Sequence, residues 1–362
     1  MYYIVLLLLL LLSFLEIIKA KKHKHLFLLM YGTMALMAIF RFGQLGDYFD
    51  YYYLYKNPLQ IRDPLFVLYT SVFSLFDLGY QFFLTITELI IFGLAFPFFY
   101  KTCKCSFISL LVFYCYTYMV CPMSALRQSV CLSLLLFSYN LLVENKRKLF
   151  YILVGIGSFI HISFLSVLLI GLLYDKKYFN GPNIVFVVIF ATVLMLFGFD
   201  MSSAMKAMFT NRSVYSVTDN PLDNAIQIVL RLIIIIPFLL FKPEYKSDGY
   251  YAKAICIIGY VLYCVLASNN LVAGRIEFFF RTFLCLFVSY LSFHYHSSVR
   301  RIVLSLFVFV HVVLFFKNLN AAISQGDYNI NVTMFNFPYI SIFDKSEIDE
   351  YTNIEKYDYD ES

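Results

Sequence analysis

The sequence of 362 residues contains no tryptophan, and only 14% of its residues are charged. Hydrophobic residues make up 61% of the chain, and a soluble protein of this length could not bury so much apolar surface. The composition therefore excludes a soluble globular protein and indicates an integral membrane protein. Without tryptophan, the aromatic anchors expected at the membrane–water interfaces are the 31 tyrosines.

Three further features are missing. No basic stripe or nucleic-acid-binding motif accompanies the net charge of +5, so we expect no nucleic-acid partner. The eight cysteines lie mostly within apolar runs and include no second pair at metal-site spacing, which favours packing over metal binding. Residues 2–18 are as apolar as a signal peptide, but no positive charge precedes them, and lysines follow at residues 19–24. This order predicts a retained first span with its N-terminus outside.

The chain consists largely of apolar runs that are long enough to cross a bilayer, without the alternation of barrel strands. In lipid, such a run satisfies its own backbone groups only as a helix. We therefore predict an all-α polytopic membrane protein with about 10–12 transmembrane helices. The runs fall near residues 2–18, 26–42, 79–99, 106–122, 124–143, 183–199, 224–241, 251–268, 276–295 and 301–317.

Six short connections are rich in lysine and arginine, and the positive-inside rule places all of them in the cytoplasm. The outer face then receives the long irregular segments 43–77, 200–223 and 269–274. An acidic tail, residues 318–362, follows the membrane domain of residues 1–317, and we expect this tail to be extracytoplasmic. The basic connections are residues 19–25, 101–104, 144–148, 175–177, 242–246 and 299–301.

Residues 149–173 conflict with a simple crossing, because basic loops flank them on both sides. A straight helix of this length would also measure ~38 Å, against a hydrocarbon core of ~30 Å. One tilted helix is the alternative, but it would place a basic loop outside. We favour a re-entrant pair of half-helices that meet near His161, a geometry that membranes tolerate where the break lines a cavity.

Arg127 and Gln128 stand at the outer entry of the span over residues 124–143. One interpretation is an interfacial anchor, with the guanidinium extended to the membrane surface. However, an arginine at the outer interface does nothing for the orientation of the chain. The second interpretation is a cation held for an anionic group of a substrate, with Gln128 supplying uncharged donors.

His161 lies in the middle of an apolar run, and Ser163 follows two residues later. The histidine is either a buried neutral side chain or a general base, because its unperturbed pKa of ~6.5 suits proton removal at neutral pH.

Two further clusters contain charged residues near the predicted outer face. Arg41, Asp47 and Tyr48 belong to a tyrosine-rich stretch that is typical of an interfacial loop and also of a surface that stacks on sugar rings. Arg275 and Arg281 lie on either side of an acidic residue, with which they can pair, and either can join an anion site.

Four stretches together resemble the EpsG family of Wzy-like bacterial exopolysaccharide polymerases. In one departure, the family usually separates the loop glycine from the aspartate by a residue, whereas here Gly46 directly precedes Asp47. The stretches are "SALRQSVCLSLLLF" (124–137), "IGSFIHISFLSVLLI" (156–170), "RFGQLGDYFDYYYLY" (41–55) and "FNFPYISIF" (335–343).

The resemblance implies a Wzy/GT-C-like helical bundle on the bacterial cytoplasmic membrane. It implies a polymerase that joins undecaprenyl-pyrophosphate-linked oligosaccharide units into exopolysaccharide, capsule or O-antigen at the outer face, alongside a chain-length regulator and a flippase. In such an enzyme, Arg127 would bind the pyrophosphate and His161 would remove a proton from the acceptor hydroxyl. Residues that would contact the substrate are Gln128, Ser163, Arg41, Asp47, Tyr48, Arg275 and Arg281.

No Asp-x-Asp motif of the kind that holds a metal-bound nucleotide occurs within residues 1–317, so we expect no metal and no other cofactor. Three alternatives to the polymerase stay open. A flippase for the same lipid-linked sugars would place charges deep in several helices and show internal repeats. A membrane O-acyltransferase would also pair arginine with histidine, and a ligase would transfer a finished polymer to another acceptor.

Overall fold

The chain is an all-α polytopic membrane protein, as the sequence predicted. In the part of the chain that the structure describes, five helices are long and apolar enough to cross a membrane, and seven shorter apolar helices accompany them. The same residues contain no β-strand, and an isolated bridge joins Arg41 to Ser341. This computed structural model describes residues 1–19, 23–43, 45, 47–174, 176–181, 183–196, 221–267, 269–294, 298–325 and 328–351.

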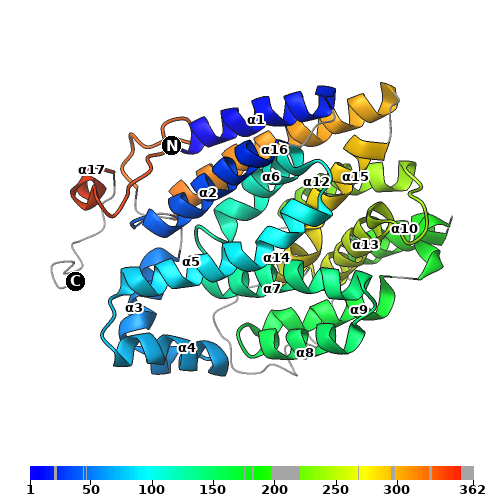
Figure 1. Cartoon of the computed structure of the whole chain (residues 1–362). Helices are drawn as coiled ribbons and strands as arrows, with labels where there is room; N and C mark the ends of the chain where they lie inside the picture. The colour runs from blue at the N-terminus through cyan, green and yellow to red at the C-terminus, as the bar shows by residue number, and fades with distance from the viewer. Residues whose placement is uncertain are drawn as a thin grey trace. The chain divides into compact units, whose positions relative to one another are not determined.

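Two compact units make up the chain, and Figure 1 labels most of their helices. Residues 1–162 and 292–362 form the first unit, and residues 163–291 form the second. The helices of the first unit are α1 (Tyr2–Lys19), α2 (Lys24–Phe40), α3 (Tyr48–Lys56), α4 (Pro64–Leu75), α5 (Tyr80–Pro97), α6 (Ser106–Val112), α7 (Leu126–Val143), α8 (Arg147–Ser158), α16 (Ser298–Gln325) and α17 (Ile348–Tyr351). Those of the second unit are α9 (Leu168–Leu173), α10 (Asn183–Leu196), α12 (Pro221–Leu240), α13 (Asp248–Leu266), α14 (Asn270–Arg281) and most of α15 (Leu284–His294).

Basic connecting loops lie together at one end of the first unit. The carboxylate of Glu16, near the end of α1, accepts hydrogen bonds of 2.8 Å from the backbone N–H groups of Ser106 and the next residue, at the start of α6. The hydroxyl of Thr102, just before α6, donates to Asn140 in the last turns of α7 over 2.8 Å. The basic loops before α6 and after α7 therefore share this end, as expected if both face the same side of the membrane.

The opposite end of the first unit carries the tyrosine-rich stretch. Gln81, at the start of α5, donates to the carbonyl of Ile39 in the last turn of α2 over 2.6 Å. The chain beyond α2 then pairs with a segment from the far end of the sequence. The N–H of Phe42 donates to the carbonyl of Ile340 over 3.1 Å, and the N–H of Ile342 donates back to Phe40 over 2.9 Å.

Three expectations about loops differ from the structure. Residues 43–77, expected to be irregular, contain α3 and α4, because Pro64 suits the first position of a helix and an apolar run follows it. Residues 269–274 are the N-cap and first turns of α14, where the side chain of Asn269 accepts a hydrogen bond from a backbone N–H. Helix α16 continues to residue 325, and residues 200–220 of the predicted outer loop lie outside the described residues.

The predicted break within residues 149–173 is confirmed. Helix α8 ends at Ser158, and a 3₁₀-helix, η4 (Ile162–Val167), precedes α9, so that His161 stands in the turn between them. The return of the chain to the cytoplasm stays a prediction.

In the second unit, α13 packs closely against α14 at Gly259. A side chain at Gly259 would overlap Phe280, so glycine permits this approach. The two basic loops of this unit also meet, because Asn180 donates to the carbonyl of Pro243 over 2.6 Å.

Candidate functional site

Arg127 is the second residue of α7, where the backbone N–H groups have no partner within the helix. The hydroxyl of Tyr51, on α3, accepts hydrogen bonds from both the backbone N–H and the side-chain Nε of Arg127, over 3.2 and 3.3 Å. The guanidinium carbon also lies 5.8 Å from the centre of the tyrosine ring. Tyr51 therefore holds the arginine at two points along its length.

Asp63 holds the other side of the same guanidinium. Its Oδ2 lies 2.5 Å from Nη1 of Arg127. The carboxylate is 11% exposed and the arginine side chain 28% exposed. Asp63 is the residue directly before α4, and the following proline favours an extended backbone there. The pair thus fixes the guanidinium while part of its surface remains accessible.

Tyr51 stays a neutral hydroxyl at this site. Burial raises its pKa above the ordinary value, and the nearby guanidinium of Arg127 offsets part of that rise. A neutral phenol can accept the two hydrogen bonds from Arg127 and still donate one. The site therefore combines a fixed cation, a carboxylate and a hydroxyl donor.

The turn that bears His161 is bonded to the elements that carry this ion pair. The carbonyl of Gly157 accepts the backbone N–H of His161 over 2.9 Å and the thiol of Cys131 over 3.3 Å. Cys131 lies one helical turn after Arg127 and on the same face of α7. The N–H of Leu65, two residues after Asp63, donates to the carbonyl of Phe159 over 3.1 Å. Two bonds thus tie the His161 turn to α7 and to the start of α4, and the Nε2 atom of His161 is buried.

Three of the motif stretches, and the first half of the stretch 156–170, are joined within the first unit. Arg127 and Tyr51 join the stretch 124–137 to 41–55, and the backbone N–H of Asp47 adds a bond of 3.3 Å to the hydroxyl of Ser124. The Cys131–Gly157 bond joins 124–137 to the first half of 156–170. The pairing of residues 40–42 with 340–342 attaches the last stretch, 335–343.

Two other predicted residues, Gln128 and Tyr48, lie beside this site and are buried. Gln128 is 6% exposed in the first turn of α7. Tyr48 packs edge-on against Tyr80 with ring centres 5.4 Å apart, and its carbonyl accepts the hydroxyl of Tyr80 over 3.3 Å. Tyr48 thus supports α3, which carries Tyr51.

Arg41 is held away from the Arg127 cluster in an ion pair of its own. Its Nη1 lies 2.7 Å from Oε1 of Glu88 on α5, and the two side chains are 1% and 0% exposed. Nη1 also donates to the carbonyl of Ala38. This geometry anchors the end of α2 to α5, next to the bridge that joins Arg41 to Ser341.

The remaining predicted residues belong to the second unit. Arg281 ends α14, and its Nη1 lies 3.9 Å from Oε1 of Glu277, the acidic residue expected as its partner. Arg275 lies earlier on the same helix. The Oγ of Ser163 is buried, with no hydrogen-bond partner among the described residues.

Sequence reasoning missed three charged residues that the structure pairs: Asp63, Glu88 and Arg231. Glu88 and Arg231 each stand alone in an apolar run, and an ionisable residue in a membrane span is by itself a signal of a specific partner. Asp63 gave a weaker signal, because it was only one carboxylate on the predicted outer face that could form an ion pair with Arg127. Among the described residues, no three His, Cys, Asp or Glu side chains gather as a metal site.

Comparison with known proteins gives one match. The family model described as the EpsG family matches residues 24–341, and this range contains three of the motif stretches in full and residues 335–341 of the fourth. Neither a search of curated proteins nor a search of solved structures finds a match.

Proposed function

The chain belongs to the EpsG family, and on that premise we propose that it joins lipid-linked oligosaccharide units into a polysaccharide on the outer face of the bacterial cytoplasmic membrane. Membership of the family implies a polymerase-like membrane protein associated with exopolysaccharide. The finer assignment is that undecaprenyl pyrophosphate carries the growing chain and is the leaving group.

The observation that carries the proposal is that hydrogen bonds join the motif stretches to one another in the first unit, with Arg127 at the contact between α7 and the tyrosine-rich stretch. A transfer from a pyrophosphate needs a fixed cation where negative charge develops, and arginine supplies a planar fork of donors that remains protonated. Asp63 and Tyr51 hold that fork from two sides. The pyrophosphate would approach the exposed part of the guanidinium.

The proposed reaction forms one carbon–oxygen bond and breaks another. A hydroxyl oxygen of the acceptor sugar attacks the anomeric carbon of the donor sugar. The bond from that carbon to the pyrophosphate oxygen breaks, and the electron pair leaves with the lipid pyrophosphate, which Arg127 stabilises. The hydroxyl proton passes to the imidazole of His161, whose turn is tied to α7 and α4.

The proposed orientation has this site on the outer face of the cytoplasmic membrane. In the first unit, basic loops gather at the end of the helices opposite to the tyrosine-rich stretch, which supports an outer position for that stretch under the positive-inside rule. The segment of residues 328–351 packs against the same end, because Tyr3 of α1 donates to the carbonyl of Met334 over 2.9 Å. This packing supports the proposal that the C-terminal tail is extracytoplasmic.

The test uses a strain that lacks the native gene and carries either the parent chain or a variant. Lipid-linked glycans are extracted and sized by mass spectrometry, and chain levels in the membrane are measured on the same samples. The polymerase proposal predicts single repeat units in the empty strain and long chains with the parent. Unchanged chain lengths in the empty strain would refute it, while lost acyl groups would indicate the acyltransferase.

The arginine is tested by Arg127→Lys, which keeps the charge and loses the planar fork. Loss of charge-assisted hydrogen bonds to a pyrophosphate should lower the polymerisation rate at least about tenfold. Arg62→Lys is the matched control, because Arg62 is exposed next to Asp63. Full activity of Arg127→Ala at the parent's membrane level would return Arg127 to the role of an interfacial anchor.

The base is tested by His161→Gln in the purified enzyme. A general base acts when it is unprotonated, so the parent's rate should rise with pH through the histidine pKa. The glutamine variant should lose that dependence and about 10²–10⁴-fold in rate. His25→Gln, at an exposed position, is the control. A variant as fast as the parent with an unchanged pH profile would rule out proton transfer by His161.

A further inference from the structure

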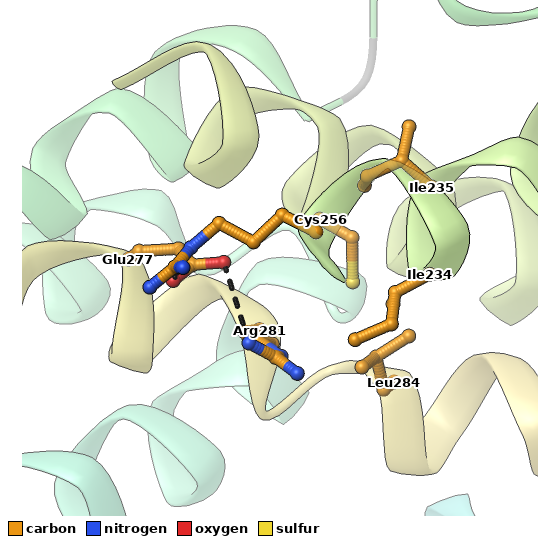
Figure 2. A pocket seen from close by; sticks show the side chains of 7 residues that line it. Ile234, Ile235, Cys256, Glu277, Arg281 and Leu284 are labelled. Atoms are coloured by element: carbon orange, nitrogen blue, oxygen red, sulfur yellow. Dashed lines mark hydrogen bonds and ion pairs between the residues drawn. The ribbon is translucent and has the colours of Figure 1, made fainter. Parts of the chain in front are cut away.

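Two cavities in the second unit differ greatly in size. The smaller one lies between α12, α13 and α14, and its wall includes Glu277 and Arg281 (Figure 2). Its volume is about 10 Å³, which admits at most one water molecule and no larger ligand. The larger one is an open groove of about 400 Å³, a size typical of small-molecule sites. The residues that line this groove are Lys176, Lys177, Tyr178 and Tyr245.

The groove lies where two basic connections of the second unit meet. One connection contains the 3₁₀-helix η5 (Lys177–Asn180), before α10, and the other precedes α13. The hydroxyl of Tyr250, at the start of α13, donates to the backbone carbonyl of Lys176. The ring of Tyr250 packs edge-on against Tyr245, with ring centres 5.2 Å apart. Because Tyr250 is fully buried, it holds both walls of the groove in place.

A buried lysine joins the same two connections. Nζ of Lys253, in the second turn of α13, donates to Oδ1 of Asn180 over 3.2 Å and to the carbonyl of Phe241 over 3.0 Å. Asn180 ends η5, and Phe241 opens the connection that precedes α13. Both acceptors are uncharged, so they fix the ammonium group without cancelling its charge. The fold therefore builds this junction around a cation.

The lining of the groove is basic and aromatic. Glu244 and Asp248 belong to the same connections, but neither is among the residues that line the groove. Nζ of Lys177 lies 5.5 Å from the centre of the Tyr245 ring. A cation–π contact orients an ammonium group but supplies no acceptor oxygen, so an anion can still accept hydrogen bonds from it. The side chains of Lys176 and Lys177 are both exposed.

Exposed apolar side chains lie next to the groove along both connections. Leu172 and Leu173, at the end of α9, come shortly before Lys176, and Leu240 ends α12 just before the second connection. In a membrane protein, exposed leucines at helix ends face the acyl chains, and the lysines and tyrosines just beyond them lie at the level of the headgroups. A molecule with an anionic head and an apolar tail therefore fits this place better than a soluble acidic peptide.

We propose that the groove binds the headgroup phosphate of an anionic phospholipid such as phosphatidylglycerol. Lys176 and Lys177 donate to the phosphate oxygens, and the exposed hydroxyl of Tyr178 adds a third donor. The positive-inside rule predicts that this lipid belongs to the cytoplasmic leaflet. The inference does not depend on the proposed polymerase function. The rival explanation is that these lysines only orient the chain, a task that needs charge but no built groove.

The first measurement is the binding of radiolabelled phosphatidylglycerol to the purified full chain in a nonionic detergent, where no anionic surface remains. The double variant Lys176→Gln/Lys177→Gln should weaken binding at least about tenfold, because charge-assisted hydrogen bonds to the phosphate are lost. Tyr178→Phe should weaken it at least about threefold. The matched control is Lys101→Gln/Lys148→Gln, which removes the same charge from exposed lysines of the first unit and should change affinity less than twofold.

Four outcomes would overturn the site. The first is unchanged affinity in the Lys176/Lys177 variant, and the second is an equal loss in the control pair, which would indicate nonspecific attraction. The third is competition by phosphatidylcholine as strong as that by phosphatidylglycerol, because the groove would then not recognise a net negative headgroup. The fourth is equally strong competition by soluble glycerol phosphate, which would show that the groove binds a free phosphate and not a lipid.

The second measurement separates loss of binding from loss of folding. A ligand that binds the folded state stabilises it, so phosphatidylglycerol should raise the unfolding midpoint of the parent but not that of Lys176→Gln/Lys177→Gln. The same shift in both proteins would refute the proposal. Lys176→Arg/Lys177→Arg keeps both charges and should bind within about threefold of the parent. If this variant bound as weakly as the glutamine variant, the lysines would act only through the structure of the loop, and the proposal would fail.

Discussion

The ion pair between Arg41 and Glu88 permits a quantitative test, because both side chains are buried and only one partner has to be changed. Their charged atoms lie 2.7 Å apart, and neither side chain is more than 1% exposed. Nε of Arg41 and Oε2 of Glu88 have no hydrogen-bond partner among the described residues. The pair is thus a buried ionic contact that is incompletely satisfied.

Removing one partner should be costly and removing both should not. Arg41→Met or Glu88→Leu alone leaves an uncompensated charge in the core, at about 3–5 kcal/mol. The double variant replaces the pair with apolar side chains and should be within about 1 kcal/mol of the parent, or more stable, because both desolvation costs disappear. At roughly 2–4 °C per kcal/mol for a unit of this size, each single change should lower the unfolding midpoint by about 10 °C.

The assay can use the chain's own cysteines. All eight are free and buried, so a dye that fluoresces on reaction with thiols reports unfolding of the purified protein in detergent. Single variants as stable as the parent would refute the reasoning. A double variant whose loss of stability equals the sum of the two single losses would refute it as well. Polymer formation by the stable double variant then tests the sequence expectation that Arg41 contacts substrate, because packing alone predicts retained activity.

Two further predictions concern the same unit and the same assay. Gly43→Ala should destabilise the chain by about 2 kcal/mol, because Gly43 has a φ of +62° and a β-carbon there would overlap Ile348 and lie 2.9 Å from Phe49. Gly79→Ala is the control, because Gly79 has a φ of +73° but open space around it, and it should cost only about 1 kcal/mol. If it costs as much as Gly43→Ala, the loss at Gly43 comes from backbone strain and not from the overlap with Ile348. Glu16→Gln should cost about 1–3 kcal/mol, since the Glu16 carboxylate accepts N–H groups at the start of α6. Glu144→Gln, in an exposed pair with Lys146, should change stability by less than about 0.5 kcal/mol, and an equal effect would contradict this role of Glu16.

The sequence by itself determined the class of fold and the family. Apolar runs of membrane length specify helices because lipid offers the backbone no other partner, and this requirement is local to each run. The break near His161 was also predictable, since basic loops on both sides of residues 149–173 conflict with one crossing. Arg127 and His161 were recognisable as candidate site residues, because an ionisable group in or beside an apolar run usually has a specific partner or role and because their neighbours match the family.

The tertiary structure alone decided which charges pair between different helices and loops. The partners lie far apart in the chain: Asp63 meets Arg127, Glu88 meets Arg41, and Arg231 meets Glu277. The sequence of an apolar span shows that the span contains a charged residue, but not which helix that residue faces. The rotation of each helix about its axis is set by packing against its neighbours. For the same reason, Arg41 and Arg127 look alike in sequence, yet one is locked inside the core and the other remains partly accessible. The pairing of residues 40–42 with 340–342 depends on backbone groups that any sequence carries, so only the folded chain reveals it.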